Sequence, residues 1–277
     1  MRKTFRNNIY QNHFEEDGYI LIEGFLNNRE IHNLVDWYRT NYTDSFEGFH
    51  ASMHSLDFQY RRKVHQEITQ IFFPKADKLL ADYRAVVGNF TVKESGHKSF
   101  FDFHLDWSML DENNARSVTI WVALEDTNAE NGNLWILEGS THLGNTWRCS
   151  PGLKLYAADD IGFSIKKYTK KVLPMKAGDA IIYDHKLFHG SPPNLSGKSR
   201  LAINLTLLPK EISSLHYHVV NEEILAYEVD DDFYCTCLTH QEMDLSNNTI
   251  RNTICDKYHQ MNQNDVNKLI EKEGGNV

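Results

Sequence analysis

The sequence changes character near residue 84, where short runs rich in β-branched and aromatic residues begin to alternate with Gly, Asn and Asp. The runs span residues 84–93, 99–105, 116–124, 133–137, 171–174, 179–184 and 200–208. Short strands separated by turn residues are typical of a β-sandwich or barrel. Helices that come first and strands that come later argue against alternating βαβ units. We therefore expect a mainly β fold.

The segment before residue 84 predicts helices that flank this β region. A short helix is expected to end at residues 15–18, with a strand over 19–22. Apolar residues at helical spacing over 31–38 predict a second helix, and residues 61–72 predict a third, which Pro74 is expected to end. The expected architecture is thus mainly β with flanking helices.

Two later segments depart from the strand pattern. Residues 145–170 lack alternation and predict a long loop, which in compact domains is often a lid or a binding loop. Residues 211–277 are polar and rich in Asn, and we expect helices near 247–260 and 263–272. Lysines gather at the end of the first segment, where they could attract an anionic substrate or form a solvated charge run: Lys166, Lys167, Lys170 and Lys171.

A chain of 277 residues suits one large domain. We expect a single domain over residues 1–277, with its core at about 10–210 and with 211–277 as a C-terminal extension packed on that core. The net charge of −9, without a basic stripe, disfavours nucleic-acid binding. No apolar run predicts a signal peptide or a membrane span, so a cytoplasmic protein is expected.

The four cysteines are too sparse for a disulfide scaffold. Cys235-Thr236-Cys237 could hold a metal, but no second cysteine pair completes a tetrahedral site. Free, unreactive thiols are the favoured interpretation.

His104-Leu105-Asp106 stands at the end of a predicted strand. On a strand, residues i and i+2 point to the same face, so His104 and Asp106 can hold one cation from one side. A third ligand, His189, would complete a triad of two histidines and one carboxylate, which is typical of non-haem Fe(II) enzymes. That triad leaves three positions open on the metal, of which a keto acid can take two and O2 the third.

A His-x-Asp/Glu triplet is weak evidence by itself, because a chain with 14 His and 38 acidic residues contains such triplets by chance. The triplets at His65 and His240 lie in segments predicted to be helical or outside the strand-rich region. On a helix, residues i and i+2 diverge, so neither is expected to chelate a metal. The position of His104 and Asp106 at a strand end favours them.

The segment around His189 adds a more specific pattern. His189-Gly190-Ser191 follows a predicted strand, and Arg200 opens the next one. A guanidinium at the floor of a barrel suits the distal carboxylate of a dicarboxylic co-substrate, and Ser191 could add a hydrogen bond to it. Alternatively, His189 is a turn histidine and Arg200 a surface residue. The presence of His104 and Asp106 upstream disfavours that alternative.

Three further residues are candidates for contact with substrate. Trp107 follows Asp106 and could form an aromatic wall of the pocket, although aromatic residues at strand ends also pack in cores. Lys93 and Asp102 lie on strands that lead to the site and could touch co-substrate or substrate. Polar residues at the edge of the core are the alternative for both.

Several ordered pieces of the sequence resemble the phytanoyl-CoA dioxygenase family of Fe(II)/2-oxoglutarate oxygenases. The resemblance covers roughly residues 10–210. The pieces are residues 14–19 and 24–26, 104–106, 121–126 with 130–134, 138–142, and 189–191 with Asn194 and Arg200. One piece departs from the family pattern, because Thr141 is inserted into its Gly-Ser-His turn.

The resemblance implies a double-stranded β-helix (jelly-roll) core in which His104, Asp106 and His189 bind iron. It also implies that Arg200 and Ser191 bind the C5 carboxylate of 2-oxoglutarate, with Trp121 lining the co-substrate pocket. Related oxygenases that halogenate replace the carboxylate ligand with a small residue, so Asp106 favours hydroxylation.

The expected activity is that of an Fe(II)/2-oxoglutarate-dependent dioxygenase, which uses O2 to hydroxylate an unactivated C–H bond of a small molecule and releases succinate and CO2. The same chemistry could also desaturate or cyclise a substrate. Two rival interpretations are a cupin-like metal enzyme without 2-oxoglutarate and an inactive jelly-roll that serves as a binding module. Asp106 and Arg200 argue against the first, and an intact triad against the second. The sequence indicates neither the substrate nor the oligomeric state.

Overall fold

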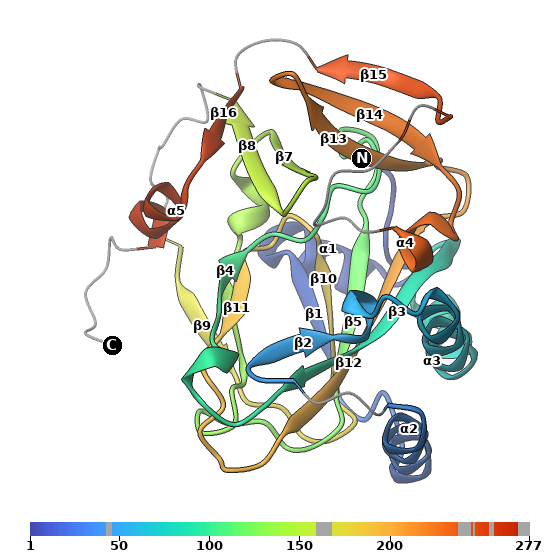
Figure 1. Ribbon diagram of the computed structural model, residues 1–277, viewed down its shortest axis with the longest axis vertical. Coiled ribbons are helices and arrows are strands. Elements are labelled where there is room, and N and C mark those ends of the chain that lie inside the picture. The colour runs from blue at the N-terminus through green and yellow to red at the C-terminus, as the bar shows by residue number, and fades with distance from the viewer. Residues whose placement is uncertain (43–45, 159–167, 238–244, 246, 255–257, 271–277) are drawn as a thin grey trace.

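The computed structural model describes residues 1–42, 46–158, 168–237, 245, 247–254 and 258–270 (Figure 1). Its centre is a pair of antiparallel sheets. The larger sheet has the order β1-β10-β5-β12-β3-β2, and the smaller has the order β4-β11-β6-β9. The strands of the larger sheet are Tyr19–Ile22 (β1), Phe49–Ala51 (β2), Tyr83–Lys93 (β3), Val118–Ala123 (β5), Ala180–Asp184 (β10) and Arg200–Pro209 (β12). Those of the smaller sheet are Phe101–His104 (β4), Leu134–Leu137 (β6), Lys170–Leu173 (β9) and His189–Ser191 (β11).

The inner faces of the two sheets share one cluster of buried side chains. Trp121 and Ile181 from the larger sheet pack with Leu134 and Ile136 from the smaller one. Because the chain passes from one sheet to the other and back, this is a double-stranded β-helix, or jelly-roll. The expected mainly β fold with flanking helices is confirmed.

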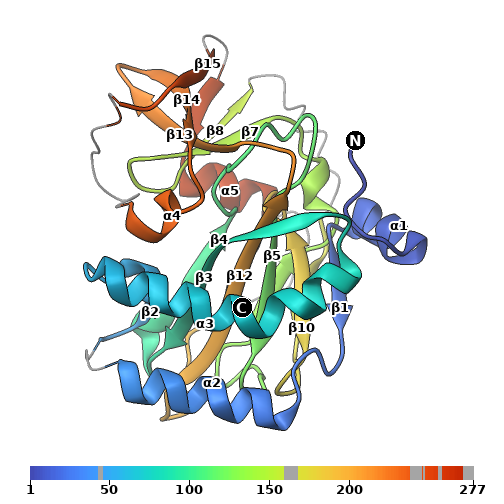
Figure 2. The same ribbon diagram turned by 90° about the vertical axis from the view of Figure 1, so that its right-hand side faces the viewer.

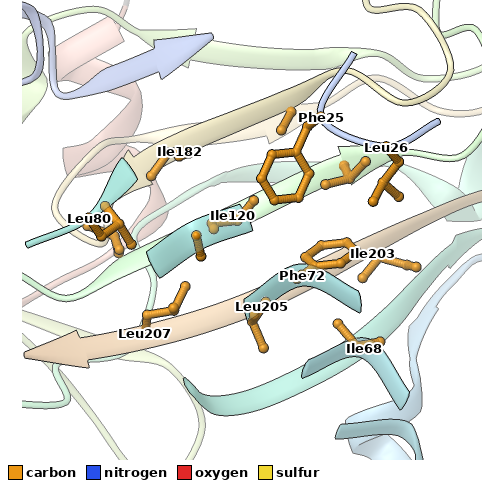
Figure 3. Close-up of a cluster of buried hydrophobic side chains, with 14 of the residues drawn as sticks. Phe25, Leu26, Ile68, Phe72, Leu80, Ile120, Ile182, Ile203, Leu205 and Leu207 are labelled. Atoms are coloured by element: carbon orange, nitrogen blue, oxygen red, sulfur yellow. The ribbon is translucent and has the colours of Figure 1, made fainter. Parts of the chain in front are cut away.

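Helices cover the outer face of the larger sheet (Figure 2). Asn28–Asn41 (α2) and Phe58–Leu79 (α3) run across this face, and Asn8–Asp17 (α1) lies beside β1 at its edge. Ile68 and Phe72 of α3 are fully buried with Ile203 and Leu205 of β12 (Figure 3). This layer fixes the sheet from outside and leaves its inner face free to line a cavity.

The prediction that Pro74 ends the third helix is wrong, since α3 continues through it to Leu79. A proline inside a helix removes a hydrogen bond and strains the preceding turn. Here the buried stripe of α3 continues beyond the proline, because Ala76 is as fully buried as Val64, Ile68 and Phe72. Packing on the sheet therefore outweighs the local cost.

Two small sheets lie above the jelly-roll and correct the predictions for the later segments (Figure 1). One has the order β16-β8-β7, with strands Tyr258–Met261, Lys154–Ala158 and Thr146–Cys149. The other has the order β13-β14-β15, with strands Ser214–Val220, Glu223–Val229 and Ile250–Ile254. Residues 145–170 thus contain a hairpin rather than only a loop, and strands occupy most of the predicted helix 247–260. The helix expected at 263–272 is present as Gln263–Ile270 (α5), and a short helix, Phe233–Thr236 (α4), follows β14.

The C-terminal segment packs against the jelly-roll through a second buried cluster. Tyr227 and Tyr234 lie with Val86 of β3 and with Met109 and Leu110, which follow β4. The segment that carries the predicted Asp106 ligand is therefore covered by residues beyond 211. Among the residues that the structure describes, no helix is long and apolar enough to cross a membrane.

Candidate metal centre

Two strands of the smaller sheet bring the predicted histidines together. His104 ends β4 and His189 begins β11, and the two are direct partners in the antiparallel register. Their rings lie 4.2 Å apart between centroids. The Asp106 Oδ1 atom is 4.0 Å from His104 Nε2 and 3.7 Å from His189 Nε2. One ligand atom from each residue lies within 4.8 Å of the others, and no other such group is found among the described residues.

Main-chain carbonyls orient both imidazoles. His104 Nδ1 donates to the carbonyl of Asp102 and His189 Nδ1 to that of Leu187, each at 2.9 Å. Since a carbonyl can only accept, the proton of each ring sits on Nδ1 and the lone pair of Nε2 faces Asp106. Burial, and then the neighbouring His189, lowers the pKa of His104 to about 4, so its ring is neutral near pH 7.

The carboxylate of Asp106 is held on its other oxygen. Its Oδ2 atom accepts hydrogen bonds from Tyr183 at 3.0 Å and Thr119 at 3.3 Å, both from the larger sheet. Burial alone would raise the pKa of Asp106, but the neighbouring imidazoles, His189 first, together with the Tyr183 hydroxyl hold it at about 2. Oδ1 is therefore an ionised donor that points between the histidines.

Arg200 lies at the deep end of the same cavity, at the start of β12. It is 2 % exposed, and its Nε and Nη1 atoms have no hydrogen-bond partner in the described part of the chain. Its guanidinium stands 5.4 Å from the centre of the Trp121 ring. Burial lowers the pKa of Arg200 to about 10, so it remains a cation at neutral pH. A buried cation with unsatisfied donors matches an anionic ligand such as a carboxylate.

The residues between Arg200 and the triad fit a dicarboxylic keto acid. The cavity is about 150 Å³, well above the roughly 10–15 Å³ that one water needs. Asn89 Oδ1, Thr91 Oγ1 and Asn204 Oδ1 border it and are buried without hydrogen bonds to the described residues. Two imidazoles and a carboxylate suit Fe(II), and the polar floor suits 2-oxoglutarate.

The structure places the other predicted site residues in two groups. Ser191, Trp121 and Trp107 line the cavity. Lys93 and Asp102 do not. Lys93 is fully buried, and its ammonium donates to the carbonyls of Ser99, Pro192 and Ser191. Asp102 accepts from the amide of Phe103.

The polar ends of Lys93 and Asp102 thus contact the main chain, as the alternative of polar residues at the edge of the core implies. The physical reason is that the side chain of Lys93 extends to main-chain carbonyls, which its ammonium contacts. The carbonyl of Ser99, which precedes β4, and those of Ser191 and Pro192, at the end of β11, surround the Lys93 ammonium. Burial, and then the charge of Arg200, lowers the pKa of Lys93 to about 7. Contact of Lys93 or Asp102 with co-substrate or substrate stays a prediction.

Sequence reasoning missed several residues that the strand register brings to the cavity. Asn204 faces Asn89 across β12 and β3, and also Trp121 across β5. Thr206 pairs with Thr119 one row nearer the metal. The alternation of polar residues along β3 and β12 was a signal for them, because a polar row on a strand that is buried on both faces requires a ligand or an internal partner.

Other residues singled out in the sequence have structural surroundings. Cys149, Cys235 and Cys237 are buried thiols, and burial raises the pKa of Cys149 to about 12. Lys171 binds Glu138 and the Tyr19 hydroxyl, and the Lys170 ammonium lies 3.5 Å from the centre of the Trp135 ring. Lys166 and Lys167 lie outside the described residues, as do His240 and Cys255.

A jelly-roll with two facing histidines, one carboxylate and a buried arginine behind them defines a class of enzyme, the non-haem oxygenases that use Fe(II) and 2-oxoglutarate. The chain belongs, within that class, to the phytanoyl-CoA dioxygenase family, whose sequence model, Phytanoyl-CoA dioxygenase (PhyH), matches residues 14–202. No curated protein sequence matched the chain.

Solved structures agree on the fold. The epimerase SnoN from nogalamycin biosynthesis, solved with Fe³⁺, α-ketoglutarate and nogalamycin RO, is 19% identical with a TM-score of 0.54, over 75% of this chain and 85% of that one. The carbocyclase SnoK from the same biosynthesis is 17% identical with a TM-score of 0.55, over 75% and 86%. HygX from Streptomyces hygroscopicus, solved with nickel, 2-oxoglutarate and hygromycin B, is 15% identical with a TM-score of 0.51, over 74% and 88%.

Proposed function

We propose that His104, Asp106 and His189 hold Fe(II), and that Arg200 with Ser191 holds the far carboxylate of 2-oxoglutarate, with Trp121 against it. The observation that carries this proposal is the convergence of three metal-ligand atoms and an unsatisfied buried guanidinium on one cavity. When bound, iron and 2-oxoglutarate supply the O2-dependent oxidation, with succinate and CO2 as products.

The chain's own residues prepare this site before any reaction. The Asp102 and Leu187 carbonyls set the two rings with Nε2 toward the metal position. Tyr183 and Thr119 hold Oδ2 of Asp106, which leaves Oδ1 for the metal. Arg200 fixes the co-substrate at its far end, and the apolar walls exclude water from the reacting centre.

We infer that the substrate presents an uncharged, apolar carbon to the metal. Besides its polar residues, the cavity is bordered by aromatic and apolar ones: Phe49, Phe101, Trp107, Met109 and Leu153. Of the described residues that line it, Asp106 and Arg200 carry the formal charges, and both already have roles in the proposal. A buried charge on the substrate would thus lack a partner there.

A small molecule is the proposed substrate class. SnoN and HygX, which share the fold, were solved with nogalamycin RO and hygromycin B, and this supports the proposal. Hydroxylation is the proposed outcome because Asp106 keeps the carboxylate ligand. A cytoplasmic location and a single domain over residues 1–277 also stay proposals.

The test is an anaerobic titration. Fe(II) and 2-oxoglutarate added together should give the weak visible charge-transfer band of a metal-bound keto acid in the wild-type protein. His104→Ala and His189→Ala should lose the band, whereas His32→Ala, which changes an exposed histidine of α2, should keep it. A cupin-like enzyme would bind metal without the band, and an inactive binding module would do neither. Absence of the band from the wild-type protein would defeat the proposal.

A further inference from the structure

The three proposed ligands are not supported in the same way. His104 and His189 lie on paired strands, so the β4–β11 ladder fixes their main chain. Asp106 lies beyond the end of β4, in the stretch from Leu105 to Met109 that belongs to no helix or strand. A different set of contacts must therefore hold the backbone of the carboxylate ligand.

Arg148 of the β7 strand supplies such a contact. Its side chain is 1 % exposed, and its Nε donates to the main-chain carbonyl of Asp106 at 2.7 Å. Its Nη1 donates at 3.1 Å to the carbonyl of Thr146 on its own strand. The guanidinium thus ties the ligand-bearing segment to the hairpin above it.

Glu112 completes the arrangement from the other end of the same segment. Its Oε2 accepts from Arg148 Nη1 at 2.6 Å, and its Oε1 accepts from Nη2. The pair is bidentate, with Arg148 buried and Glu112 partly buried, so the charge of Arg148 is compensated and its plane is fixed. A hydrogen bond from the Arg148 amide to Ser108 Oγ at 3.2 Å joins the two backbones between these points.

We infer that Arg148, oriented by Glu112, is a positioning residue that sets Asp106 at the right distance from His104 and His189. This inference rests on the proposed metal site. Because the planar guanidinium bonds the Asp106 carbonyl and both Glu112 oxygens at once, a lysine cannot replace it, although its charge is the same. The hairpin, which lies in the predicted loop 145–170, thereby takes part in building the metal site.

The experiment measures Co(II) binding to the full-length protein by the visible spectrum of the bound ion, so it needs no substrate and no turnover. Arg148→Lys and Arg148→Met should raise the Kd for Co(II) roughly 10- to 100-fold, the usual range for groups that orient metal ligands. Glu112→Gln keeps the hydrogen bonds from Arg148 to the carbonyls of Asp106 and Thr146, so it should raise the Kd for Co(II) less. The spectrum of bound Co(II) in the Arg148 variants should also change, since the ligand geometry relaxes.

Arg61 of α3 is the matched control. It is also buried, at 3 % exposure, and donates to two main-chain carbonyls, those of Cys237 and Tyr234, at 2.8 and 2.9 Å. Arg61→Lys should lower the melting temperature of the metal-free protein without changing the Kd for Co(II).

The outcomes separate the positioning role from the proposed function. If wild-type protein binds Co(II) and the Arg148 variants bind it within twofold of wild type, the positioning role is wrong and the proposed function stands. If Arg61→Lys raises the Kd for Co(II) as much as the Arg148 variants do, the weaker binding reflects general destabilisation, and the positioning role of Arg148 is again wrong. Should Arg148→Met fail to fold, Arg148→Lys and Glu112→Gln decide the matter. Wild-type protein that binds no Co(II) would remove both proposals.

Discussion

At the scale of single residues, the site contains two kinds of buried polar side chain: those whose donors have hydrogen-bond partners and those whose donors lack them in the described chain. Lys93 and Arg148 are buried basic side chains whose donors meet carbonyls or carboxylates. Arg200 is a buried cation whose Nε and Nη1 meet nothing in the described chain. Since leaving such donors unpaired costs about 1–3 kcal/mol or more, the unpaired guanidinium is the one expected to gain most from an anionic ligand.

Replacing that guanidinium should weaken the co-substrate and spare the metal. We expect Arg200→Gln to raise the KM for 2-oxoglutarate roughly 10- to 100-fold, as loss of a charge-assisted hydrogen bond implies, with little change in Co(II) affinity. Steady-state kinetics with varied 2-oxoglutarate would measure it. Arg62→Gln, which removes an exposed arginine paired with Asp232, serves as the control. An unchanged KM in Arg200→Gln would remove Arg200 from the co-substrate site.

Sequence reasoning predicted residues whose chemistry is local. His104 and Asp106 are two positions apart, and His189 and Arg200 bracket one turn, so their pattern is visible along the chain. Asn204 and Arg148 were not predicted, because their roles depend on the strands that pair with β12 and on the segment that β7 meets. Both interpretations of Lys93 were open in the sequence, and only the structure shows that its ammonium contacts main-chain carbonyls.

At the scale of elements, the approach of β4 to β11 decides whether the histidines can share a metal. Gly190 lies between His189 and Ser191 at this contact. A Cβ atom on Gly190 would stand 2.9 Å from the carbonyl oxygen of Phe101 and 3.0 Å from that of Asp102. The latter carbonyl also orients His104. A glycine here lets the two backbones approach closely, which accounts for the His-Gly-Ser pattern.

Gly190→Ala should push the two strands apart. We expect at least a tenfold rise in the Kd for Co(II) and a loss of about 1–3 kcal/mol in the free energy of unfolding, the usual cost of overpacking. Gly197→Ala is the control, because its φ of +77° is strained for alanine but no atom lies within 4 Å of the added Cβ. Chemical denaturation and Co(II) titration of both variants would check this. Equal metal affinity in the two variants would contradict the close-approach argument.

The elements that could be predicted were those with a strong local pattern. The strand over 19–22 and the longer strands of the jelly-roll were found to within about two residues, whereas the three-residue strands β2 and β11 were not predicted. The β7–β8 hairpin was not predicted. Its strand β8 also pairs with β16, about 100 residues later, and the sequence near 154–158 does not indicate that partner. Residues 247–260 were predicted to be helical for a similar reason, because the strands that pair with β15 and β16 lie elsewhere in the chain.

At the scale of the whole molecule, the C-terminal sheet closes over the metal-site segment through His216 on β13. His216 is 1 % exposed and lies 4.9 Å from Phe233, 6.4 Å from Trp107 and 5.8 Å from His218 between ring centroids. Burial, and then His218, lowers the pKa of His216 to about 3. The contact between extension and core thus contains an imidazole that is neutral when folded.

This contact should make the folded protein sensitive to acid. In the unfolded chain, His216 takes up a proton below about pH 6.5, whereas in the folded protein it does so near its lowered pKa, so the free energy of unfolding falls as the pH is lowered through that window. The upper limit is about 1.4 kcal/mol per pH unit. His216→Phe should reduce the loss between about pH 6.5 and pH 5, measured by urea unfolding.

The exposed His32 offers the comparison for this measurement, since His32→Asn should change the pH dependence less than His216→Phe does. An identical pH slope in wild type and His216→Phe would show that the acid sensitivity arises elsewhere.

The two facing sheets contribute different residues to the cavity. The smaller sheet carries the histidines, the larger sheet carries Arg200 and its polar row, and the segments after β4 and β7 add the apolar residues Met109 and Leu153. Substitutions at these apolar residues can therefore change which compounds bind, while the residues proposed to hold iron and 2-oxoglutarate stay unchanged. For protein engineering, this makes Met109 and Leu153 the natural positions at which to diversify a library.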